Sequence, residues 1–81
     1  MAAETTITAP LPGTFYRRPS PDADPFVSEG DQVAPDDVVG LVEVMKTFLE
    51  VRADTAGVVE RFLVENGDPV EAGQPLLELR G

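Results

Sequence analysis

Hydrophobic residues along this chain fall in short runs that alternate with polar residues, and turn-forming residues separate the runs. Seven glycines and eight prolines interrupt the 81 residues, and no stretch keeps a helical hydrophobic spacing. Such short runs predict strands rather than helices. The strands are expected at residues 5–9, 14–16, 38–44, 47–53, 57–63 and 75–80, with two shorter ones near 32–33 and 69–70. We therefore expect one all-β domain over residues 1–81, with residues 1–4 disordered.

The two halves of the chain repeat one pattern of glycines, turns and strands. Gly13 and Gly57 are 44 positions apart. The turn glycines Gly30 and Gly67 are 37 positions apart, so the first half holds seven additional residues. These residues lie in a segment at about 18–25, where three prolines disfavour a strand. A duplicated β-unit with one insertion predicts a quasi-two-fold sandwich that carries one protruding loop.

A two-residue turn, Met45-Lys46, is expected to join the strands at 38–44 and 47–53 and to lie on the pseudo-symmetry axis. Tight hairpin turns favour Asn-Gly or Asp-Gly because both turn residues need positive φ, so Met-Lys breaks a local rule. The predicted cross-strand pairs are Val44 with Thr47, Val42 with Leu49 and Gly40 with Val51. One face then holds the core residues Val42, Val44, Leu49 and Val51, and the other a mixed surface of Leu41, Glu43, Phe48, Glu50 and Arg52.

Composition and charge exclude several classes of function. The chain has no cysteine and no histidine, so the usual thiol nucleophile, general base and commonest metal ligands are missing, and we expect no catalytic residues. The net charge of −9 disfavours binding to nucleic acid or to an anionic membrane. The N-terminus shows no signal peptide, and we expect the cytoplasm. The acidic pairs Asp36/Asp37 and Asp22/Asp24 are interpreted as solvated or capping turn residues rather than metal ligands.

Lys46 is the only lysine, because the other five basic residues are arginines. A lysine is most often a solvated surface charge. A single lysine at a hairpin tip, in a turn whose residues do not suit it, instead suggests a covalent attachment point.

The sequence around this turn resembles the biotinylation motif of biotin carboxyl carrier domains, which are biotinyl/lipoyl attachment domains. Residues 43–46, Glu-Val-Met-Lys, are similar to the Glu-Ala-Met-Lys of that family. Residues 9–17 resemble the opening of the carrier of bacterial acetyl-CoA carboxylase, and residues 20–23, Ser-Pro-Asp-Ala, resemble its protruding thumb. The similarity continues through residues 56–59 and 64–70 and covers about residues 6–80.

The resemblance implies a flattened barrel-sandwich of two four-stranded antiparallel sheets, with a thumb at about residues 18–25. It also implies biotin joined to Lys46 by an amide, in a non-catalytic carrier. On this reading the lysine arm shuttles carboxybiotin from a biotin carboxylase to a carboxyltransferase, which delivers the carboxyl group to an acyl-CoA or similar acceptor. The implied partners are these two enzymes and the biotin protein ligase.

Four residues depart from the family pattern, and one of them is Asp36, which stands in place of a turn glycine. The other three lie in or near the candidate site. Val44 replaces alanine, Thr47 replaces the usual second methionine, and Arg18 stands where the thumb commonly has a small hydroxyl residue. Arg18 remains a candidate thumb contact to biotin, and Glu43 and Met45 complete the candidate binding residues. The alternatives are a lipoyl carrier of a 2-oxoacid dehydrogenase or glycine-cleavage type, and an unmodified β-sandwich adaptor. Met45 before Lys46 favours biotin over lipoate.

Overall fold

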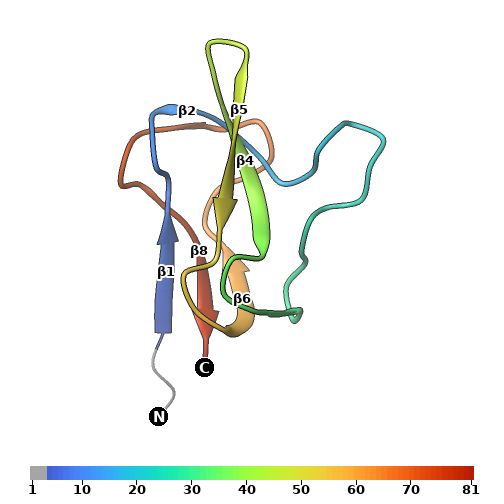
Figure 1. The fold of residues 1–81 in the computed structure, drawn as a ribbon, viewed down its shortest axis with the longest axis vertical. Helices are drawn as coiled ribbons and strands as arrows, with labels where there is room; N and C mark the ends of the chain where they lie inside the picture. The colour runs from blue at the N-terminus through green and yellow to red at the C-terminus, as the bar shows by residue number, and fades with distance from the viewer. Residues whose placement is uncertain (1–3) are drawn as a thin grey trace.

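The computed structural model describes residues 4–81, which fold into eight strands with no helix in that range (Figure 1). The strands are β1 (Glu4–Thr8), β2 (Gly13–Tyr16), β3 (Gln32–Val33), β4 (Val38–Val44), β5 (Thr47–Arg52), β6 (Gly57–Phe62), β7 (Pro69–Val70) and β8 (Pro75–Arg80). Every expected strand is present, with small differences at the ends. Glu4 begins β1, so the predicted disorder does not extend to it, and residues 1–3 lie outside the described residues.

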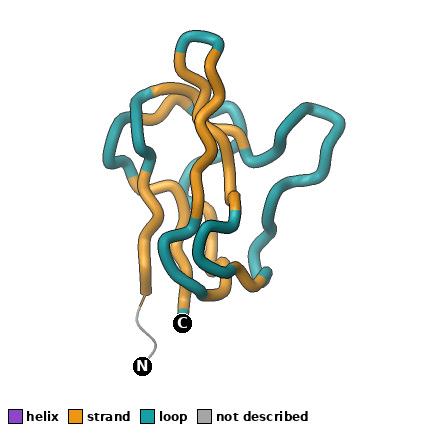
Figure 2. Tube along the Cα trace, viewed as in Figure 1, coloured by secondary structure: helices purple, strands orange, loops and turns teal. Residues whose placement is uncertain are grey.

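The strands form two four-stranded antiparallel sheets, which confirms the predicted fold class. One sheet has the order β1-β8-β6-β3 and the other the order β5-β4-β2-β7. Exchanging β1 with β5, β2 with β6, β3 with β7 and β4 with β8 converts one order into the other. The sandwich is therefore quasi-two-fold, and its extents of 40 × 27 × 20 Å make it flattened (Figure 2).

Backbone hydrogen bonds repeat between the halves at the two offsets found in the sequence. Ala9 N donates to Gln74 O in one half, and Ala53 N donates to Asp37 O in the other, both at 2.9 Å. The donors are 44 positions apart and the acceptors 37, as the glycine spacing predicts. The duplication is thus present in the backbone bonding as well as in the strand order.

The core lies between the two sheets. Its fully buried large side chains are Phe15, Val39, Val42, Val59, Leu76, Leu77 and Leu79. Phe15 corresponds to Val59, and Gly40 corresponds to Leu77, so each half pairs one larger residue with one smaller one. A Cβ on Gly40 would lie 2.5 Å from Cε1 of Phe15. The first half therefore fills the core with Phe15 and leaves no room for a side chain at position 40.

The β4–β5 hairpin does not lie on the pseudo-two-fold axis, and our expectation on this point is wrong. A turn on that axis would be its own counterpart. Glu43 pairs with Phe48 in the hairpin, and the symmetry-related pair is Arg80 with Glu4, where the last strand meets the first. Figure 1 shows the hairpin and the C-terminal end of β8 at opposite ends of the long axis. The turn glycines reveal the duplication but not the position of its axis.

The longest connection, residues 17–31, contains the seven additional residues of the first half. Figure 2 shows it as a loop that runs out to the side of the two sheets and back. Phe26 N donates to Arg17 O at 2.9 Å, so a backbone hydrogen bond closes the outer part of the loop. Arg17 N in turn donates to Oδ1 of Asn66 at 2.7 Å, which ties the base of the loop to the second half.

Candidate functional site

The β4–β5 turn has the conformation that its sequence does not suit. Met45 has φ of 49° and Lys46 has φ of 68°, so both turn residues are in the left-handed region. Val44 pairs with Thr47, Val42 with Leu49 and Gly40 with Val51, which confirms the predicted register. Two consecutive left-handed residues with long side chains are costly, and such strain persists only where the surrounding structure imposes it.

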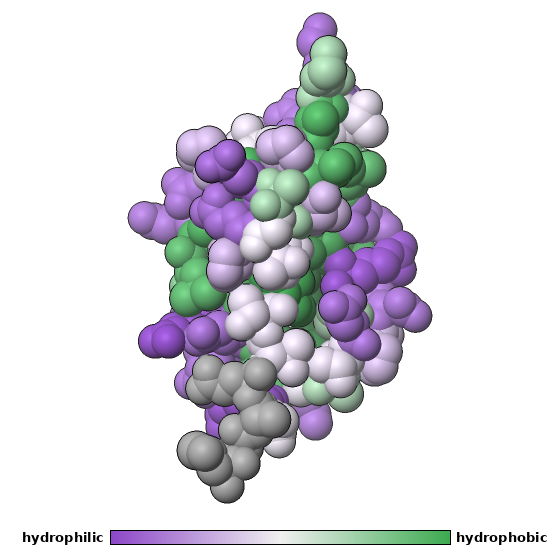
Figure 3. Space-filling model, turned by 90° about the vertical axis from the view of Figure 1, so that its left-hand side faces the viewer, coloured by the Kyte–Doolittle hydropathy of each residue, from purple (hydrophilic) through white to green (hydrophobic). Residues whose placement is uncertain are grey.

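The turn presents both of its side chains to solvent. Met45 is 93% exposed and Lys46 is also exposed. Over residues 4–81 no acidic side chain pairs with Lys46, whereas Arg52, Arg61 and Arg80 each pair with a glutamate. Figure 3 shows hydrophobic atoms gathered directly below the hydrophilic tip of the hairpin. The primary amine thus stands at the extreme of the molecule, next to an exposed apolar side chain.

Packing beneath the turn holds the hairpin in place. Val42 is fully buried, and Val44 is partly buried against the core, whereas Thr47 is exposed. A Cβ on Gly13 would lie 2.3 Å from the backbone oxygen of Glu43, so β2 approaches β4 closely just below the turn. The tip is therefore presented on a rigid support rather than on a loose loop.

Glu43, Tyr16 and Phe48 meet on the outer face of the hairpin sheet. The Tyr16 hydroxyl donates to Oε1 of Glu43 at 3.2 Å, and the rings of Tyr16 and Phe48 have centroids 6.2 Å apart. The hydrogen bond to Glu43, together with partial desolvation and the glutamate charge, raises the pKa of the Tyr16 phenol. Sequence reasoning missed this group, because only the strand order shows that Tyr16 lies next to these residues.

One predicted surface residue is buried. Leu41 was expected on the mixed outer face but is only 9% exposed. It lies on β4, an inner strand of its sheet, between Tyr16 on β2 and Glu50 on β5. The long side chains of these cross-strand neighbours explain how an outward-facing residue loses its contact with water.

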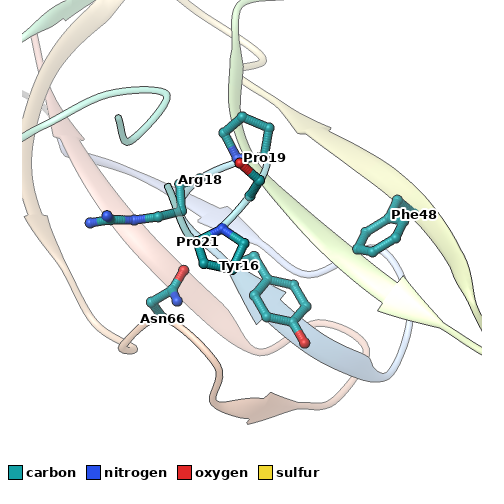
Figure 4. Close-up of a pocket in the computed structure, with 7 residues that line it drawn as sticks. Tyr16, Arg18, Pro19, Pro21, Phe48 and Asn66 are labelled. Atoms are coloured by element: carbon teal, nitrogen blue, oxygen red, sulfur yellow. The ribbon is translucent and has the colours of Figure 1, made fainter. Parts of the chain in front are cut away.

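A cavity of about 260 Å³ lies beside the hairpin, between the sheet and the 17–31 loop. It is lined by Tyr16, Arg18, Pro19, Ser20, Pro21, Phe48 and Asn66. Figure 4 shows Tyr16 and Phe48 on the sheet side, with Arg18 and the prolines on the loop. The Arg18 side chain extends away from Phe48, and its Nε is buried without a hydrogen-bond partner.

The other candidate chemistry has structural explanations where the contacts are seen. Oδ2 of Asp37 accepts a hydrogen bond from Ala34 N at 2.8 Å, which is a turn-capping role. Asp36 has φ of 74°, a conformation that aspartate tolerates. Residues 4–81 contain no cluster of three or more acidic side chains that could hold a metal ion. They also contain no helix long and apolar enough to span a membrane.

Comparison with known proteins gives consistent matches over nearly the whole chain. Residues 5–79 match the family model described as "Biotin-requiring enzyme". The biotin carboxyl carrier protein of acetyl-CoA carboxylase from Chlamydia muridarum is 51% identical over 73 residues, which cover 90% of this chain and 45% of that protein. Its counterpart from Chlamydia trachomatis is 49% identical, with coverage of 90% and 44%. The chain thus spans less than half the length of these relatives.

A solved structure supports the same grouping. The urea carboxylase of Kluyveromyces lactis matches with a TM-score of 0.78 and 30% identity, over 95% of this chain and 6% of that enzyme. The same fold therefore occurs as a small part of a much larger carboxylase.

Proposed function

Because the chain belongs to the family of biotin-requiring enzymes, we propose that Lys46 carries covalent biotin and that the protein is a biotin carboxyl carrier. The exposed primary amine of Lys46, on a rigid hairpin tip and without an acidic partner, is the observation that carries this proposal. The parent enzyme is a biotin-dependent carboxylase of the acetyl-CoA carboxylase type, as in the curated relatives. When bound, biotin supplies a ureido nitrogen that accepts and releases a carboxyl group.

The residues around Lys46 suit an attachment site. The amine needs access for an acylating enzyme and a fixed base from which the arm can reach. The exposed turn supplies the access, and the packed strands beneath it supply the base. The lysine stem and the biotin chain together form an arm with a length on the order of 10 Å. A tethered group keeps a high effective concentration at two successive active sites. Amide formation removes the lysine charge and changes the net charge from −9 to −10.

The cavity beside the hairpin could hold part of the biotin. Tyr16 and Phe48 offer aromatic walls, and Arg18 and Asn66 offer hydrogen-bond donors. The thumb proposed at about residues 18–25 belongs to the 17–31 loop, which borders this cavity. Arg18 would have to turn toward the hairpin, since its side chain now extends away from Phe48 (Figure 4). Met45, Val44, Glu43 and Thr47 surround the lysine and form the surface that the modifying enzyme meets.

The proposed partners are a biotin carboxylase, a carboxyltransferase and a biotin protein ligase, with no nucleic acid and no membrane. The net charge of −9 supports basic docking surfaces on these proteins. The proposal also includes a cytoplasmic location. The carrier supplies no acid or base of its own, in keeping with the absence of histidine and cysteine.

Intact-mass measurement after co-expression with a biotin protein ligase tests the proposal. We expect one biotinyl adduct on the wild type and none on Lys46→Arg, which keeps the positive charge and leaves no primary amine on any side chain. Parallel co-expression with a lipoyl ligase should give no adduct. A lipoyl adduct in place of biotin would assign the chain to the lipoyl carriers, and an unmodified wild type with an active ligase would favour an adaptor.

A further inference from the structure

The pseudo-two-fold symmetry relates the Tyr16–Glu43 hydrogen bond to an ion pair at the other end of the molecule. Tyr16 corresponds to Glu60 through the offset of 44, and Glu43 corresponds to Arg80 through the offset of 37. Oε1 of Glu60 lies 3.2 Å from Nε of Arg80, the same separation as between the Tyr16 hydroxyl and Glu43. At each end of the fold, one glutamate therefore takes part in the contact between the second strand of a half and the end of its fourth strand.

The two pairs differ in their charge. Glu60 has the Arg80 guanidinium as its partner, whereas the Tyr16 phenol is a neutral donor and brings no positive charge to Glu43. Over residues 4–81 no arginine or lysine pairs with Glu43, although Arg52, Arg61 and Arg80 each neutralise a glutamate elsewhere. The pKa of Tyr16 is raised by this contact, so the phenol stays a neutral donor over the physiological range.

The surroundings of Tyr16 hold its hydroxyl in position. Its strand, β2, lies between β4 and β7. Its ring contacts that of Phe48 on β5, the outer strand of the hairpin. Gly13 brings the backbones of β2 and β4 together at Glu43 itself. The Glu43 carboxylate is therefore held on a rigid surface three positions before Lys46, instead of sampling the rotamers of an exposed glutamate.

We propose that Tyr16 is a positioning residue for the modification of Lys46. It holds the Glu43 carboxylate in place through a neutral hydrogen bond and keeps its charge available to an arginine or lysine of the modifying enzyme. This inference rests on the proposed function, because it assumes that an enzyme acylates Lys46. A positioned charge that is neutralised only in the complex favours binding of the correct partner and fixes its register on the hairpin.

Steady-state kinetics with a purified biotin protein ligase, biotin and ATP tests the proposal on the whole domain. Tyr16→Phe keeps the ring contact with Phe48 and removes only the hydroxyl. We expect it to raise the KM for the domain about fivefold, the worth of one hydrogen bond, with little change in kcat. Glu43→Gln keeps an acceptor for the hydroxyl but removes the charge, so its KM should rise about tenfold.

The double variant separates positioning from other roles. If Tyr16 acts through the Glu43 charge, Tyr16→Phe should change KM less than twofold in the Glu43→Gln background. Glu60→Gln is the matched control, since it removes the corresponding carboxylate at the far end, and its KM should equal that of the wild type. The KM of the wild type should rise with salt more steeply than that of Glu43→Gln. Thermal unfolding verifies that each variant is folded.

The outcomes distinguish this inference from the function it rests on. A wild type that the ligase does not modify overturns both. If the wild type is modified and Tyr16→Phe or Glu43→Gln has the same KM, only the positioning role is overturned. The same holds if Tyr16→Phe retains its full effect in the Glu43→Gln background, since Tyr16 would then act through another residue.

Discussion

Replacing Met45 with glycine should stabilise the fold, although it removes a large hydrophobic side chain. Met45 has φ of 49° and is 93% exposed, so the change relieves backbone strain and removes little packing. The left-handed conformation costs an ordinary residue roughly 1–2 kcal/mol, and glycine adopts it freely. The greater freedom of glycine in the unfolded chain offsets roughly 0.5–1 kcal/mol of this gain. The net gain in unfolding free energy should be about 0.5–1 kcal/mol.

Thermal unfolding followed by circular dichroism measures this effect. For a domain of this size we expect a rise in Tm of about 2–8 °C. Thr47→Gly is the matched control, because Thr47 is exposed and adjacent to the turn but does not have positive φ. It should lose roughly 0.5–1 kcal/mol, because glycine loses more conformational freedom than threonine when this first residue of β5 is ordered.

A Met45→Gly variant whose Tm falls as far as that of Thr47→Gly would contradict the assignment of strain to this turn. The turn would then carry no strain, and methionine would contribute stability that its exposure does not explain. We also expect the stabilised variant to be a poorer substrate for the modifying enzyme, because it lacks the apolar side chain beside Lys46. Strain kept at an exposed position is typical of a surface selected for function rather than for stability.

Three further predictions concern the core, the hydrogen bond and the loop. Gly40→Ala should lower the unfolding free energy by about 1–3 kcal/mol, because its Cβ would meet Phe15. In the Phe15→Val background, Gly40→Ala should cost less unfolding free energy in a denaturation experiment. If the two losses simply add, the Cβ of residue 40 does not collide with Phe15. The ultraviolet titration of Tyr16, the only tyrosine, should have its midpoint above about 10, and Glu43→Gln should lower it toward that value. Since the folded-state pKa of Tyr16 is raised, the stability from this contact is fully present below about pH 10 and is lost as pH rises through the folded pKa. A titration midpoint that Glu43→Gln leaves unchanged would disprove the coupling between Tyr16 and Glu43. Deleting residues 19–25 should leave a folded sandwich by circular dichroism, because Arg17 and Phe26 are already joined by a hydrogen bond; global unfolding would contradict the independence of the loop.

The sequence predicts the features that depend on local pattern or on the repeat. The alternation of hydrophobic residues predicts all eight strands, and the paired glycine offsets predict the quasi-two-fold sandwich. The register of the hairpin follows from a two-residue turn, since the turn length alone fixes which residues are opposite each other. The exposed lysine at its tip follows from the same reasoning.

Features that depend on which strands become neighbours are not predictable in this way. Tyr16 lies beside Glu43 and Phe48 only because β2 pairs with β4, and Leu41 is buried for the same reason. The hydrogen bond between Arg17 and Asn66 at the base of the 17–31 loop joins positions 49 residues apart, so no local sequence pattern predicts it. The axis was misplaced because a repeat shows that two halves match without showing how they pack.

Peptide mapping by tandem mass spectrometry identifies both the modified residue and the group that it carries. The domain would be incubated with purified biotin ligase and lipoyl ligase together, each supplied with its cofactor and ATP, and then digested. We expect a biotinyl group on the peptide that contains Lys46 and no modification elsewhere. Lipoate on Lys46, or biotin on any other position, would contradict it.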